Sequence, residues 1–103
     1  VLCSYEKAYI WVIAELSDLT QNKDLITSDK VSKINNQIWS LIDDWRSQSE
    51  EIKTKYYWET LLKGLLALMD HPDQWVIMWL CKGIIHIFDV LFVESIQYKQ
   101  EDP

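Results

Sequence analysis

Three polar residues in the otherwise apolar segment 75–93 have the types and spacing that chemistry requires. Lys82, His86 and Asp89 follow one another at intervals of four and three residues, so a helix would bring them to one side. A histidine beside an amine and a carboxylate could transfer a proton or bind a ligand inside a helical bundle. The same residues would equally form the one polar face of a buried helix, and we favour that structural interpretation.

Asp70, His71 and Asp73 form a second polar group, which could offer oxygen and nitrogen ligands to a metal ion. The chain has only two histidines, however, and it has no HExxH or CxxC spacing. An acidic turn before a helix is a common structural device. The two glycines, Gly64 and Gly83, cannot make a phosphate-binding loop, and no GxSxG motif occurs. We therefore predict no metal, no cofactor and no enzymatic activity.

The chain is acidic, with 16 Asp and Glu residues against 10 Lys and Arg residues and a formal net charge of -6. Nucleic-acid binding needs a basic face, so this balance argues against a nucleic-acid partner and against an anionic membrane surface. It suits a basic protein partner or simple solubility. Acidic residues gather at one junction, where they would either contact that partner or solvate two helix ends: Asp43, Asp44, Glu50 and Glu51.

Segment 75–93 is the most apolar part of the sequence. It is long enough to span a bilayer, but Lys82, His86 and Asp89 would be costly inside one, so we predict a bundle helix and no membrane association. A helix that is apolar almost all round must be covered on two sides, either by three other helices or by another chain. The residues expected on a face shared with a dimer or a partner are Trp75, Trp79, Ile84 and Ile87.

Hydrophobic periodicity predicts four helices that position these residues, over 4–17, 27–48, 50–69 and 72–98, with a frayed tail at 99–103. The second has the clearest pattern, because Thr27 or Ser28 can cap it and its apolar residues step by 3, 4, 3 and 4. These residues are Val31, Ile34, Ile38, Leu41 and Trp45. Gly64, inside the third helix, indicates a close helix crossing.

The expected fold is a single all-α domain over residues 1–103, a four-helix bundle with short connections and antiparallel neighbours. The last and most apolar helix, at about 72–98, is expected at its centre. Cys3 and Cys81 are expected to be free thiols, and no signal peptide is visible, which together indicate the cytoplasm.

Three functions fit this sequence. The first is a small protein-binding module, in its most specific form an inhibitor or immunity protein that neutralises a basic partner such as a nuclease toxin. The second is a homo-oligomeric structural protein, whose dimer interface is formed by those apolar residues of the last helix that the other helices do not cover. The third is a small helical ligand carrier or enzyme that uses Lys82, His86 and Asp89.

Overall fold

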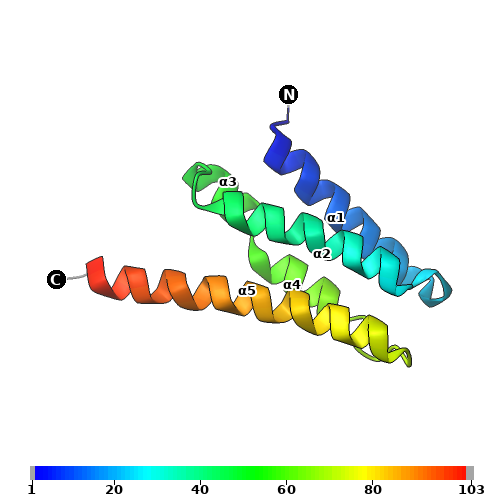
Figure 1. Ribbon diagram of the computed structural model, residues 1–103. Coiled ribbons are helices and arrows are strands. Elements are labelled where there is room, and N and C mark those ends of the chain that lie inside the picture. Colours follow the sequence, from blue (N-terminus) through cyan, green and yellow to red (C-terminus); the bar gives the residue numbers. More distant parts are fainter. Residues whose placement is uncertain (1, 102–103) are drawn as a thin grey trace.

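A computed structural model describes the backbone of residues 2–101 and the side chains of residues 2–90, 92 and 93. Helices α1 (Ser4–Gln21) and α2 (Ser28–Trp45) are joined through a short 3-10 helix, η1 (Lys23–Leu25). They are followed by α3 (Glu50–Lys55), α4 (Trp58–Leu66) and the long α5 (Gln74–Glu101). No strand occurs among the described residues. The fold is the predicted all-α four-helix bundle, with α3 and α4 together in the place of the third helix (Figure 1).

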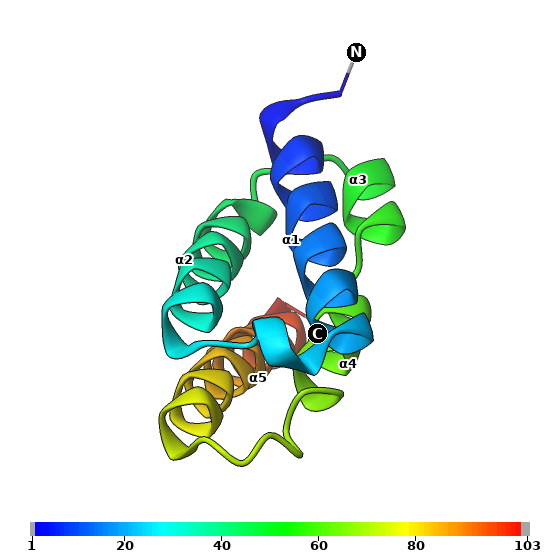
Figure 2. The same cartoon turned by 90° about the vertical axis from the view of Figure 1, so that its right-hand side faces the viewer.

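The helices pack as two pairs around one hydrophobic core. Helices α1 and α2 run antiparallel, and so do α4 and α5 (Figure 1). The pairs are joined where α2 packs along α5 and α1 packs along α4 (Figure 2). The predicted seam of α2 is confirmed, since Val31, Ile34, Ile38 and Leu41 are all buried and Trp45 is half-buried. Thr27 is the N-cap, because its hydroxyl accepts a hydrogen bond from the Lys30 N–H at 3.2 Å.

Helix α1 is longer than its sequence pattern predicted. It continues to Gln21, four residues beyond the predicted end at residue 17. The reason is Leu19, which lies one turn after the buried Leu16 and is itself buried, so the apolar face extends past the polar residues. The other boundaries move less: α2 ends at Trp45 rather than 48, and α5 begins at 74 rather than 72.

The predicted helix over 50–69 is interrupted at Tyr56 and Tyr57. The buried Tyr56 ring packs edge-on against the Tyr9 ring, with 5.0 Å between centroids, and its hydroxyl donates to the Glu6 carboxylate at 2.7 Å. The Tyr9 hydroxyl in turn donates to the main-chain carbonyl of Tyr57 at 2.9 Å. These contacts attach the break to α1. Tertiary packing therefore overrides the continuous helical pattern here.

The Tyr56–Glu6 hydrogen bond makes stability depend on acidity. The bond from Tyr56 lowers the pKa of the Glu6 carboxyl below its ordinary value of 4.5, and the Cys3 N–H adds to this. A lowered folded-state pKa stabilises the fold above pH 4.5 and loses this effect as the pH falls through the folded value. We expect Glu6→Gln to lower the Tm at pH 7 and the difference from wild type to vanish in acid.

Tyr56→Phe is the matched variant for this prediction, because it removes the donor and leaves the carboxylate. It should give a loss of Tm with the same pH dependence but a smaller size, because the Cys3 N–H still contacts the carboxylate, and the double variant should lose no more than Glu6→Gln alone. Thermal unfolding followed by circular dichroism between pH 7 and pH 3 measures all four proteins. A Tm difference that is unchanged across this range would show that the hydrogen bond does not cause it.

Helix α5 does not lie at the centre of the bundle, where it was predicted. It packs against α2 and α4 through one face, and its opposite face is exposed, so it lies at the edge of the bundle rather than at its centre (Figure 2). Its C-terminal end projects beyond the other helices (Figure 1). Of the tail expected to fray, residues 99–101 belong to α5, and residues 102 and 103 lie outside the described residues.

Candidate functional site

The inward face of α5 is set by four residues that step by 4, 3 and 4. Val76, Leu80, Gly83 and Ile87 are all buried against α2 and α4. A residue two positions away from this line points away from the core, because successive helical residues are separated by about 100°. The opposite side of α5 therefore faces away from α2 and α4.

Large apolar side chains cover that opposite side. Ile85 is 57% exposed, Phe88 is 54% exposed and Phe92 is 65% exposed. They step by 3 and 4 along the helix and so form one stripe, which we call the outer face of α5. Single exposed Leu or Ile residues are common on soluble proteins, whereas these three residues form a contiguous apolar stripe that includes two Phe side chains.

The face predicted from the sequence is rotated relative to this one. Ile87 is only 1% exposed and belongs to the core, and Trp79 and Ile84 are half-buried against it. Of the four predicted residues, Trp75 alone is largely exposed, near the start of α5. Ile87 therefore cannot contribute to a docking surface in this fold. The sequence analysis correctly predicted that α5 has more apolar residues than the bundle covers, but it placed the exposed ones on the wrong side of the helix.

A close crossing between α2 and α5 fixes this rotation. A Cβ atom on Gly83 would lie 2.5 Å from Oδ1 of Asn35, so only glycine lets α2 approach at this position. Asn35 is fully buried and its side-chain amide donates to the main-chain carbonyl of Trp79. The glycine and the amide thus hold one side of α5 against α2. The predicted crossing at Gly64 is confirmed as well, since a Cβ there would lie 2.8 Å from Cδ1 of Leu16.

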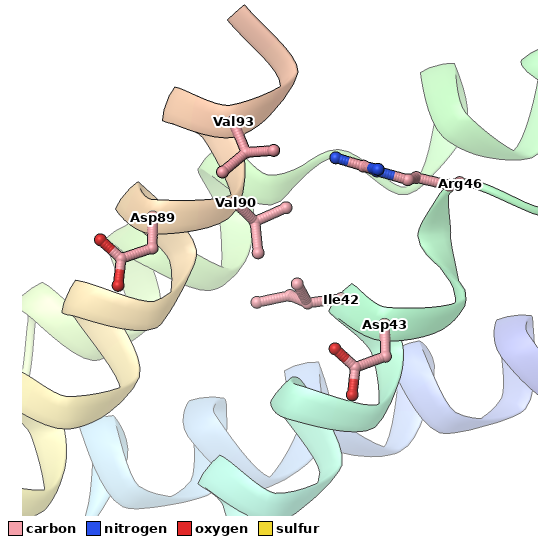
Figure 3. Close-up of a pocket in the computed structure, with 6 residues that line it drawn as sticks. All are labelled: Ile42, Asp43, Arg46, Asp89, Val90 and Val93. Carbon is pink, nitrogen blue, oxygen red and sulfur yellow. The ribbon is translucent and has the colours of Figure 1, made fainter. Parts of the chain in front are cut away.

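Acidic side chains also lie where α2 and α5 diverge. A hollow of about 320 Å³ opens there, lined on the α2 side by Ile42, Asp43 and Arg46 and on the α5 side by Asp89, Val90 and Val93 (Figure 3). The two carboxylates come from the two facing helices, and the Arg46 side chain reaches toward α5 (Figure 3). Apolar atoms form the floor, so the hollow combines an apolar contact with a charged rim.

Lys82, His86 and Asp89 line a second, shallower hollow together with Trp39 and Ile85. They form no hydrogen bond or ion pair with one another in the described part of the chain. The Lys82 ammonium lies over the Trp79 ring, 4.6 Å from its centroid. The His86 ring packs against Trp39 at 5.3 Å, and its Nε2 is buried without a partner. This arrangement fits the structural interpretation better than proton transfer, which needs hydrogen-bonded groups.

The residues considered as metal ligands make local structural contacts instead. Asp70 pairs with Lys23 at 2.6 Å, and Nδ1 of His71 accepts a hydrogen bond from the Asp73 N–H at 3.1 Å. Asp73 in turn accepts from the Trp75 N–H at 2.8 Å, at the start of α5. No group of three His, Cys, Asp or Glu side chains able to hold a metal ion is found among the described residues. Cys3 and Cys81 are free thiols.

The acidic junction is exposed as a whole. Asp43 and Asp44 lie in the last turn of α2, and Glu50 and Glu51 lie in the first turn of α3, where they suit the helix dipole. Ser49 caps α3, since its hydroxyl accepts from the Ile52 N–H at 3.3 Å. Glu50 forms a long ion pair with Lys53, at 3.8 Å. Because all four side chains are exposed, the junction presents its negative charge to solvent or to a partner.

Comparison with known proteins adds no family or relative to this description. No known protein family matches the chain, and neither a curated protein nor a solved structure matches it. Within the residues that the structure describes, none of the helices combines the length and the apolar character that crossing a membrane requires. The function must therefore be inferred from the surface of the molecule itself.

Proposed function

We propose that this chain is a small protein-interaction module that contacts another protein chain through the outer face of α5. The observation that carries the proposal is the exposure of Ile85, Phe88 and Phe92 in one stripe. Burying such a stripe gives roughly 25 cal/mol for each Å² removed from water, and aromatic residues dominate the energetics of protein interfaces. The separation of Lys82, His86 and Asp89 into unconnected contacts gives no support to an enzyme.

The border of this face favours a particular kind of partner surface. Asp89 lies beside Ile85 of this face and also lines the hollow that holds Asp43, and the whole chain carries a net charge of -6. Complementary charges at the rim of an interface speed association and select the partner. An apolar surface with basic residues around it would fit best.

A specific form of this proposal is an inhibitor, such as an immunity protein that neutralises a basic nuclease toxin in the cytoplasm. Its support is the exposed acidic junction of Asp43, Asp44, Glu50 and Glu51. Reversing these four charges to Lys should weaken capture of a basic partner and leave the Tm nearly unchanged, because the side chains are on the surface. Unchanged capture would exclude the junction as the contact site.

Co-purification from the cells that make the protein tests the general proposal. A tagged chain should retain a bound protein, and Ile85→Asp should lose it. Ile10→Asp is the matched control, because Ile10 is also in the middle of a helix and is 46% exposed. Equal recovery of the bound protein with both variants would place the contact elsewhere and reject the outer face of α5.

A further inference from the structure

The outer face of α5 is part of a longer regular pattern. Met78, Cys81, Ile85, Phe88 and Phe92 step by 3, 4, 3 and 4 along the helix. This is the spacing of the a and d positions of a coiled coil, in which two helices pack their side chains into one another. We call this line of residues the seam of α5. Met78 and Cys81 are half-buried and the other three are exposed, so the exposed part of the seam lies toward the C-terminal end of α5.

We propose that a second copy of this chain occupies this seam, with the two α5 helices antiparallel about a two-fold axis. The inference rests on the proposed function and names the partner at the same surface. A two-fold contact uses the same patch on both molecules, so the patch must be complementary to itself. A seam of alternating a and d residues meets this condition, because Ile85 of each copy packs against Phe88 of the other.

The charges beside the seam select the antiparallel arrangement. Lys82 and Asp89 are seven residues apart and lie along the same edge of the seam, at equivalent positions of the repeat. When Ile85 packs against Phe88 of the second copy, Lys82 comes opposite Asp89 of the second copy, and the two-fold axis repeats this pair. A parallel pairing would instead bring this edge beside the apolar edge that holds Ile77 and Ile84. Only the antiparallel pairing gives each charge an opposite charge.

The exposed aromatic surface is small for a stable dimer. An aromatic side chain offers about 200 Å² in all, so Phe88, 54% exposed, and Phe92, 65% exposed, together contribute roughly 240 Å² from each copy. A stable interface takes about 800 Å² from each partner, so we expect a weak dimer that dissociates on dilution. The helix has 28 residues, and its C-terminal end projects beyond the bundle (Figure 1), which leaves room for a second helix.

The first experiment is the solution mass of the purified full chain, by light scattering behind a sizing column over a hundredfold range of protein concentration. We expect a dimer near twice the chain mass of 12.3 kDa that dissociates on dilution. Ile85→Asp places a charge in both copies of the seam and should weaken the dimer roughly 1000-fold. Ile10→Asp, matched in residue type and exposure, should leave the dimer unchanged.

The second experiment tests the orientation by exchanging charges. Lys82→Asp alone or Asp89→Lys alone sets like charges opposite one another twice, which should weaken the dimer roughly tenfold. The variant that carries both changes restores two opposite-charge pairs and should recover the dimer. Circular dichroism confirms that each variant is folded, so that loss of association is not loss of structure.

Each outcome decides one of the two proposals. A wild-type monomer at every concentration, or a dimer that survives Ile85→Asp, overturns the second copy as the occupant. A dimer that the double charge exchange fails to recover overturns the antiparallel arrangement. The proposed function is judged separately, by co-purification: a different protein lost with Ile85→Asp would retain the interaction module and reject only the second copy.

Discussion

Trp58→Ala is expected to lower the free energy of unfolding by about 3–5 kcal/mol, the usual loss for a buried aromatic residue cut back to alanine. Trp58 is buried at the first residue of α4, and its ring lies 5.7 Å from the ring of Trp45. A loss of this size is a large part of the whole stability of a chain this small. Urea unfolding followed by fluorescence and circular dichroism measures it.

Trp58→Phe is the control that keeps this prediction decisive if the alanine variant fails to fold. The Nε1 atom of Trp58 is buried without a hydrogen-bond partner, so its removal relieves a desolvated polar group. We expect Trp58→Phe to retain most of the stability, with a loss of about 1–2 kcal/mol. Equal losses for the two variants would show that the ring does not fill the space between α2 and α4.

Gly83→Ala is expected to destabilise the fold by about 1–2 kcal/mol, although alanine is the better helix former by about 1 kcal/mol. The new methyl group would meet Oδ1 of Asn35 at 2.5 Å, and the buried amide of Asn35 is held by its hydrogen bond to Trp79. Because the α2–α5 crossing cannot relax easily, the steric term exceeds the gain in helix propensity. Urea unfolding again gives the change in free energy.

A double-mutant cycle isolates that contact. In an Asn35→Ala background the gain in helix propensity remains without the clash, so Gly83→Ala should stabilise by up to about 1 kcal/mol and the two sites should couple by about 2–3 kcal/mol. Gly64→Ala is the comparison at the other crossing, where the methyl group would meet the movable Cδ1 of Leu16 at 2.8 Å and should cost less. Additive effects of Gly83→Ala and Asn35→Ala would mean that Asn35 does not set the position of α5.

The sequence predicted the helical fold wherever one face of a helix was clearly polar. Helix α2 is the best case, since its apolar seam is separated from charged residues and both the cap and the buried face are as expected. The break at Tyr56 and Tyr57 could not be predicted, because it depends on hydrogen bonds with Tyr9 and Glu6, which lie about fifty residues earlier. Local pattern does not contain that information.

The outer face of α5 shows the same limit at the candidate site. Its spacing is visible in the sequence at Ile85, Phe88 and Phe92, but a helix that is apolar all round contains several such stripes. Polar residues normally indicate which stripe faces water, and here they are few. The rotation is fixed by Gly83 against Asn35, a contact between helices about fifty residues apart. The surplus of apolar surface could therefore be predicted, but not its direction.

Photo-crosslinking inside the cells that make the protein tests most directly whether the outer face of α5 is a protein contact surface. A photoreactive phenylalanine analogue replaces Phe88 in one variant and the equally helical, exposed Ile10 in a control. We expect a covalent adduct from position 88 and none from position 10, and the mass of the adduct identifies a second copy or another protein. Irradiated chains that remain at 12.3 kDa from both positions would contradict it.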